Sequence, residues 1–212
     1  MAGKDFYRLR GQQVVKALIE NEFEALYCDT GREAVDAVLK WVPGKITVGI
    51  GGSITIRDLG LAARLKSMGC RVYDVFEEGL TPEEKMALRR KQITADLFLS
   101  STNAVTLQGQ LVNTDSSGNR VASMIFGPRR VIVVAGINKI VTNLEAALDR
   151  IKSLAAPQIA RYLGFTAPCA GTGICKGCFP ADNICRVTTV IDAKPGAMES
   201  FLVVLVGEPL GF

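Results

Sequence analysis

The sequence predicts an α/β protein with an open, mainly parallel sheet, helices on both faces and a cysteine loop near the C-terminus. Short apolar runs alternate along the chain with stretches of helical periodicity, a pattern typical of parallel strands joined by helices. Apolar residues make up 48% of the 212 residues, which is enough to build a sizeable core. We therefore expect a single domain over residues 1–212.

The first elements expected are helices over about residues 5–42. Apolar positions at helical spacing predict the first helix over residues 5–26. Thr30 is expected to cap the second helix. Pro43 and Gly44 end it, because these two residue types terminate helices.

A strand, a glycine turn and a helix are expected next. The apolar run of residues 46–50 predicts a buried strand. Gly51 and Gly52 then form a turn, and the helix that follows runs to about Met68 before Gly69 stops it.

A capping box marks the helix after that. Thr81 is the expected N-cap, Pro82 takes the first helical position and Glu84 completes the box. The other expected elements are, along the chain, strands at residues 71–76 and 97–100, a hairpin at 104–107 and 111–114, a strand at 131–135, a helix capped by Thr142, a helix from Pro157, and strands at 187–191 and 202–206.

Charge and composition exclude several classes of function. The net charge of +4 comes from interspersed residues, so we expect no nucleic acid partner. Residues 1–10 lack the apolar centre of a signal peptide, and no apolar run approaches the roughly 18 residues of a membrane helix. We expect a cytoplasmic protein whose thiols stay reduced. The absence of histidine excludes a histidine base or ligand.

Five motifs resemble the lactate-utilisation (LUD) domain family. They are GIGGSIT at residues 49–55, ADLFLSSTNA at 95–104, GNRVA at 118–122, FGPRRVIVV at 126–134 and GINKIV at 136–141. The resemblance covers about residues 10–206. It implies an open α/β fold similar to that of ribose-5-phosphate isomerases, glucosamine-6-phosphate deaminases and CoA-transferases. It also implies a role in lactate or related organic-acid metabolism.

One segment departs from the family pattern. Many LUD proteins linked to lactate oxidation carry a Glu-Thr-Gly-like segment before the hairpin, whereas this chain has TNAV at residues 102–105. The chain therefore looks more like a short, cysteine-bearing branch of the family.

The glycine turn is a candidate anion site. Gly51 and Gly52 expose backbone N–H groups before a helix, while Ser53 and Thr55 add hydroxyl groups. The same residues also suit a tight turn in which Ser53 caps the helix, so the glycines alone leave both interpretations open. The family resemblance favours ligand binding.

Two further polar residues are expected near this turn. Ligands gather at the carboxyl ends of parallel strands, so Asn103 is expected to face the same crevice as Ser53. Arg120 is a candidate clamp for a carboxylate or phosphate. The Asn, Asp and Ser residues nearby are also ordinary turn residues, which leaves a structural role open. Lys139 follows a strand end and could pair with an anion, although we expect its side chain to be solvated.

Residues 165–186 hold the clearest chemical signal. Cys169, Cys175, Cys178 and Cys185 are spaced C-x5-C-x2-C-x6-C in a stretch without periodicity. Reduced thiols without histidine suit a soft metal. Structural zinc sites pair two short knuckles, whereas only Cys175 and Cys178 form one here. We expect a [4Fe–4S] cluster, with zinc as the alternative. The isolated Cys28 and Cys70 are expected to be buried.

Three functions remain open from the sequence. The first is an iron–sulfur accessory protein or enzyme that acts on a small anionic organic substrate with a redox protein partner. The second is a zinc-stapled protein that binds an organic anion without redox chemistry. The third is a regulatory or assembly protein without catalysis. Whether the chain forms a homo-oligomer is also open.

Overall fold

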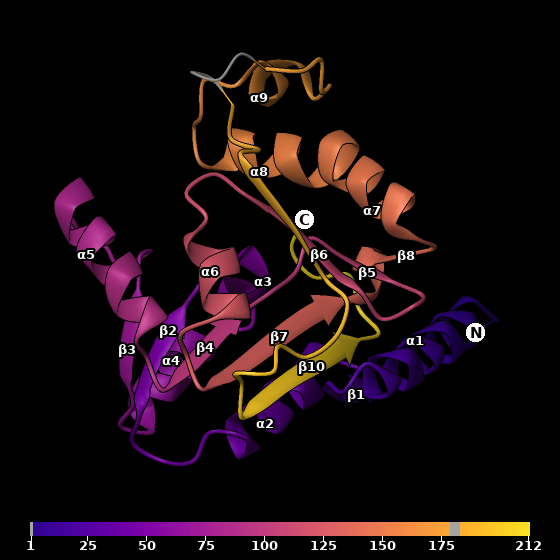
Figure 1. Ribbon diagram of the computed structural model, residues 1–212, viewed down its shortest axis with the longest axis horizontal. Coiled ribbons are helices and arrows are strands. Elements are labelled where there is room, and N and C mark those ends of the chain that lie inside the picture. Colours follow the sequence, from indigo (N-terminus) through magenta and orange to yellow (C-terminus); the bar gives the residue numbers. More distant parts are fainter. Residues whose placement is uncertain (1, 179–182) are drawn as a thin grey trace.

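Two sheets organise the chain (Figure 1). The computed structural model describes residues 2–178 and 183–212, and in these the larger sheet has six parallel strands in the order β1-β10-β7-β4-β2-β3. Its strands are β1 (Glu24–Cys28), β2 (Thr47–Ile50), β3 (Arg71–Asp74), β4 (Leu97–Ser100), β7 (Arg130–Gly136) and β10 (Ser200–Val206). The predicted fold class, a mainly parallel sheet between helices, is confirmed.

A smaller sheet lies beside the first. Its order is β8-β5-β6-β9, formed by β8 (Ile140–Val141), β5 (Ala104–Thr106), β6 (Leu111–Asp115) and β9 (Val187–Ile191). Strands β5 and β6 form the predicted antiparallel hairpin, and β9 pairs antiparallel with β6. The chain therefore leaves the large sheet after β4 to form β5 and β6 and returns to it as β7. It leaves again to form β8 and β9 before β10 completes the large sheet.

Helices cover both faces of the large sheet. On one face lie α2 (Gly31–Lys40), α3 (Ile54–Asp58) and α4 (Leu61–Ser67), whose apolar side chains share a core with Ile132 and Val204. On the other face, α1 (Ala2–Glu20) and α6 (Asn119–Ile125) share a core with Phe98 and Phe201, while α5 (Pro82–Ile93) packs against β2 and β3. Burial of these apolar faces is the main stabilising contribution to the domain.

A helical layer covers the outer face of the small sheet. It consists of α7 (Leu144–Arg150), a π-helical turn at Ile151–Ala155 and α8 (Ala156–Tyr162), and α9 (Pro168–Thr172) packs on α8. Ala147 and Ile151 contact Ala104 and Val112 of the hairpin. Figure 1 shows α7 and α8 as one continuous rod. The π-helical turn and α8 of this rod line the site described below.

The predicted helix over residues 5–26 is wrong in its last part. Helix α1 ends at Glu20, Glu22 takes a left-handed φ of 64°, and β1 follows. Strand β1 pairs with β10, which lies far downstream, and this long-range pairing overrides the local helical periodicity. The N-terminal segment to residue 42 is therefore helix, strand, helix.

Other boundaries differ for local reasons. Gly60, with a φ of 64°, divides the predicted helix up to Met68 into α3 and α4. Asn143 rather than Thr142 caps α7, and the π-helical turn carries the helix through Pro157 without a break. The predicted caps at Thr30 and Thr81 are confirmed. None of the helices in the described residues is long and apolar enough to span a membrane.

Candidate functional site

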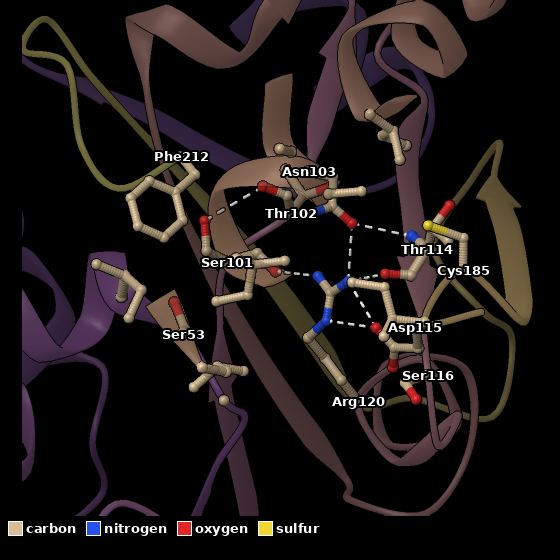
Figure 2. A pocket seen from close by; sticks show the side chains of 18 of the residues that line it. Ser53, Ser101, Thr102, Asn103, Thr114, Asp115, Ser116, Arg120, Cys185 and Phe212 are labelled. Atoms are coloured by element: carbon tan, nitrogen blue, oxygen red, sulfur yellow. Dashed lines mark hydrogen bonds and ion pairs between the residues drawn. The ribbon is translucent and has the colours of Figure 1, made fainter. Parts of the chain in front are cut away.

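A cavity of about 390 Å³ opens where β2, β4 and β7 end (Figure 2). In a parallel sheet all strands end at the same edge, and the connecting loops leave a crevice there. The loops after β2 and β4, the hairpin strand β6 and the start of α6 supply polar side chains to its wall. Helix α8 and the segment after it supply apolar ones.

Only some residues of the predicted glycine turn line this cavity. Gly52, Ser53 and Thr55 line it, whereas Gly51 does not. The N–H of Gly51 donates to the carbonyl of Leu99, and a Cβ at Gly51 would lie 2.8 Å from the Ser100 hydroxyl. Gly51 therefore allows close packing against β4. Ser53 caps α3 by accepting from the N–H of Ile56, as its structural interpretation required.

Lys139 lies at the centre of the site, and the expectation of a solvated side chain is wrong. Its side chain is only 4% exposed because the short 3-10 helix after β7 (Ile137–Lys139) turns it into the cavity. Its Nζ donates to Thr55 Oγ1 at 3.0 Å and to Ser101 Oγ at 2.9 Å. An ammonium group has a third N–H, which neither hydroxyl occupies.

Burial, together with the nearby guanidinium groups of Arg150 and Arg120, lowers the pKa of Lys139 to about 7. Asp58 acts in the opposite direction, but it forms no salt bridge with Lys139. Near neutral pH the amine therefore exchanges readily between its charged and neutral forms. A negative charge in the cavity would favour the charged form.

Arg150 is a buried cation that sequence reasoning missed. It lies in the last turn of α7, donates to the carbonyls of Asn138 (3.0 Å) and Asn103 (2.7 Å), and leaves Nη2 without a hydrogen-bond partner in the described residues. Burial lowers its pKa. A basic residue in the last turn of a helix normally lies in solvent and stabilises the helix dipole, so the sequence carried no signal of its burial.

Arg120 is held by a dense hydrogen-bond network (Figure 2). Its guanidinium pairs with the carboxylate of Asp115 at 2.7 Å and donates to the side chains of Asn113 (2.6 Å) and Asn103 (2.8 Å). It also donates to the carbonyls of Ser101 and Thr114. The protein thus engages all five N–H groups of Arg120. The arginine joins the end of β4 to β6.

Asn103 and Arg120 both line the cavity, as predicted, but their direct contact with a ligand stays a prediction. The carbonyl oxygen of the Asn103 side chain accepts from Arg120 and from the N–H of Thr114 at 2.9 Å. A ligand would have to replace one of these bonds to reach Arg120. The hydrogen bonds of Asn103 and Arg120 instead give these two residues a structural role in the cavity wall.

The charges around the cavity do not balance. Arg120 has its carboxylate partner, but neither Lys139 nor Arg150 forms a salt bridge within the described part of the chain. A buried charge without a partner is costly. An anion that accepts the third N–H of Lys139 would lower that cost. The site therefore favours anionic ligands.

The cysteine loop adjoins the cavity. Cys185 lines its wall (Figure 2). Cys169 is buried against α8 and Cys175 is exposed. Burial raises the pKa of Cys169 and Cys185, and the charges of Cys175 and Cys178 act in the same direction.

Metal binding by this loop stays a prediction. Across residues 2–178 and 183–212, no three His, Cys, Asp or Glu side chains are arranged to hold a metal ion. The four cysteines are free thiols of one loop, and thiolates are the donor type that zinc and iron–sulfur clusters take. The two isolated cysteines are buried as predicted, and burial raises the pKa of Cys28 to about 11.

The fold and cavity define an open α/β domain with a ligand-sized crevice at the carboxyl edge of its parallel sheet. The sequence profile of the LUD domain matches residues 11–206, and the chain therefore belongs to the LUD domain family. It is similar in structure to a DUF162 family protein from Deinococcus radiodurans, with a TM-score of 0.57 and 14% identity over 94% of this chain and 98% of that one. That identity supports a common fold alone. No curated protein shows significant similarity to the chain.

Proposed function

We propose that this protein binds a small organic anion at Lys139 and holds a metal centre in the adjoining cysteine loop. The observation that carries the first part is the buried ammonium group of Lys139, which lacks a carboxylate partner in the described residues and lines a cavity. A site that must bury a cation accepts an anion more readily than a neutral molecule.

Each polar residue has a distinct role in this proposal. Lys139 donates its third N–H to an oxygen of the anion, and Thr55 with Ser101 fixes the direction of that donation by accepting the other two. Because the pKa of Lys139 is lowered to about 7, anion binding is accompanied by proton uptake above that pH. Lys139 is also the group that can return a proton to a bound oxyanion.

The cysteine loop supplies the second part of the proposal. Cys169, Cys175, Cys178 and Cys185 would hold the metal centre, and Cys185 is the one that reaches the cavity wall. A [4Fe–4S] cluster would supply electron transfer between the bound organic acid and a redox protein partner, whereas zinc would supply structural support alone. The LUD family membership supports lactate or a related organic acid as the ligand class.

Anion binding is tested by thermal unfolding with lactate, other carboxylates and inorganic phosphate. We expect an anion to raise the Tm of the wild-type chain, and Lys139→Met to remove that increase. Lys16→Met, which removes the same charge from an exposed position on α1, is the matched control and should respond as the wild type does. Equal responses from Lys139→Met and wild type would reject the site.

The metal centre is tested on protein purified without oxygen. Iron, sulfide and zinc are measured together with the visible spectrum. We expect iron and sulfide with cluster absorbance, lost in Cys175→Ser and retained in the control Cys70→Ser. One equivalent of zinc without absorbance would reject the cluster and keep the site. Absence of any metal, with unchanged stability of Cys175→Ser, would reject both.

A further inference from the structure

The cavity has two chemically different sides. Thr55, Ser101 and Lys139 form a polar floor at the strand ends. Another part of its wall comes from the π-helical turn Ile151–Ala155, from α8 and from the segments beside them. Its side chains are apolar: Ile151, Ala155, Ile159, Leu163, Phe165 and Phe212.

The size of the cavity exceeds what a two- or three-carbon acid needs. At about 390 Å³ it has room for roughly a dozen water molecules, taking about 30 Å³ for each. A small acid held at Lys139 would leave the apolar wall in contact with water. Removing apolar surface from water is favourable, so a ligand that also covers this wall binds more tightly.

We propose that the ligand is an amphipathic monocarboxylate, whose carboxylate contacts Lys139 and whose apolar chain or ring lies against Ile159 and Ala155. This inference rests on the proposed anion binding and narrows the ligand class within it. The polar floor and the apolar wall belong to one cavity, so a single molecule can contact both. Lactate has only a methyl group to offer the apolar wall.

The test is a chain-length series measured on the full-length wild-type protein. The Kd values of acetate, butanoate, hexanoate and octanoate are determined by calorimetry, with inorganic phosphate as a compact anion of different shape. Each buried methylene should lower the Kd about four-fold, or roughly sixteen-fold for each step of two carbons, until the cavity is filled. Phosphate and acetate should bind with similar, weak affinity.

Two variants locate the ligand's apolar chain within the cavity, and a third serves as the control. Ala155→Leu fills space at the apolar wall and should weaken hexanoate at least ten-fold while it leaves acetate unchanged. Ile159→Ala removes contact area and should weaken hexanoate several-fold. Leu154→Ala is the control, because Leu154 lies on the same helical rod, is 41% exposed and does not line the cavity. The Tm of each variant shows that it is folded.

The results separate this inference from the proposal on which it rests. Lys139-dependent binding with equal Kd for all four acids would overturn the amphipathic ligand and retain the anion site. An unchanged affinity for hexanoate in both Ala155→Leu and Ile159→Ala would also overturn the amphipathic ligand, because the alkyl chain of hexanoate would then lie elsewhere. Failure of every acid and of phosphate to bind would overturn the anion site itself.

Discussion

Replacing Lys139 by methionine should stabilise the ligand-free protein while it abolishes anion binding. Methionine keeps most of the apolar stem of lysine and removes the buried charge. The pKa of Lys139 falls from 10.5 in the unfolded chain to about 7 in the folded one. At 1.36 kcal/mol for each pKa unit, the charged form costs roughly 4–5 kcal/mol of folding free energy below pH 7. Loss of two hydrogen bonds offsets roughly 1–3 kcal/mol of the gain.

The sign of the pH dependence follows from the lowered pKa. Below pH 7 the amine is protonated in both states, and the full cost of burying its charge is present. Between pH 7 and 10.5 the unfolded chain binds more protons than the folded one, so wild-type stability rises with pH. The advantage of Lys139→Met over wild type should therefore shrink by roughly 2 kcal/mol between pH 7 and pH 9.

The assay is urea unfolding of the two proteins at pH 6, 7, 8 and 9 without ligand, with Lys16→Met as the control. A functional residue that destabilises its own fold is an expected trade-off at a binding site. If Lys139→Met were less stable than wild type by several kcal/mol at pH 6, the reasoning would be refuted. Lys139 would then be a structural element whose hydrogen bonds outweigh the cost of its charge.

Three further predictions concern the same site. Affinity for a carboxylate should fall by about ten-fold for each pH unit well above 7, because binding requires the protonated amine of Lys139, and calorimetry from pH 6 to 9 measures this slope. Arg120→Met should cost roughly 3–5 kcal/mol in urea unfolding, because it leaves a buried carboxylate unpaired, whereas Arg129→Met at an exposed ion pair should cost under about 1 kcal/mol. Gly51→Ala should lower the free energy of unfolding by roughly 1–3 kcal/mol, because the added methyl group would lie 2.8 Å from the hydroxyl of a serine. Gly52→Ala should lower it much less, because the nearest atom to its methyl group would be 4.0 Å away. Thermal unfolding compares the two variants.

Local sequence patterns determined the elements whose signals are local. The capping box at Thr81 and Glu84, the N-cap at Thr30 and the hairpin after β4 depend on neighbouring residues, and each was predicted. The apolar runs of β2 and β7 identified a parallel sheet because both faces of such a sheet are buried. The cysteine loop was also evident from spacing alone, although its metal remains a prediction.

The tertiary structure decided what depends on distant segments. Strand β1 is a strand because β10 provides its pairing partner, and its own residues resemble the end of a helix. The division into two sheets arises from the hairpin after β4, which pairs with β8 and β9 instead of joining the larger sheet. The local periodicity of the sequence does not show which distant strands will pair, so it could not predict these partners.

In the site, too, the sequence predicted some features and only the tertiary structure decided others. The sequence placed Ser53, Thr55 and Asn103 at strand ends, and the parallel arrangement of β2 and β4 was sufficient to bring them to one cavity. Burial of Lys139 and Arg150 could not be deduced, because both look like ordinary surface cations until α7 and α8 cover the strand ends. A residue type fixes which charge a side chain carries, but only the surrounding fold determines whether water, protein or a ligand must neutralise it.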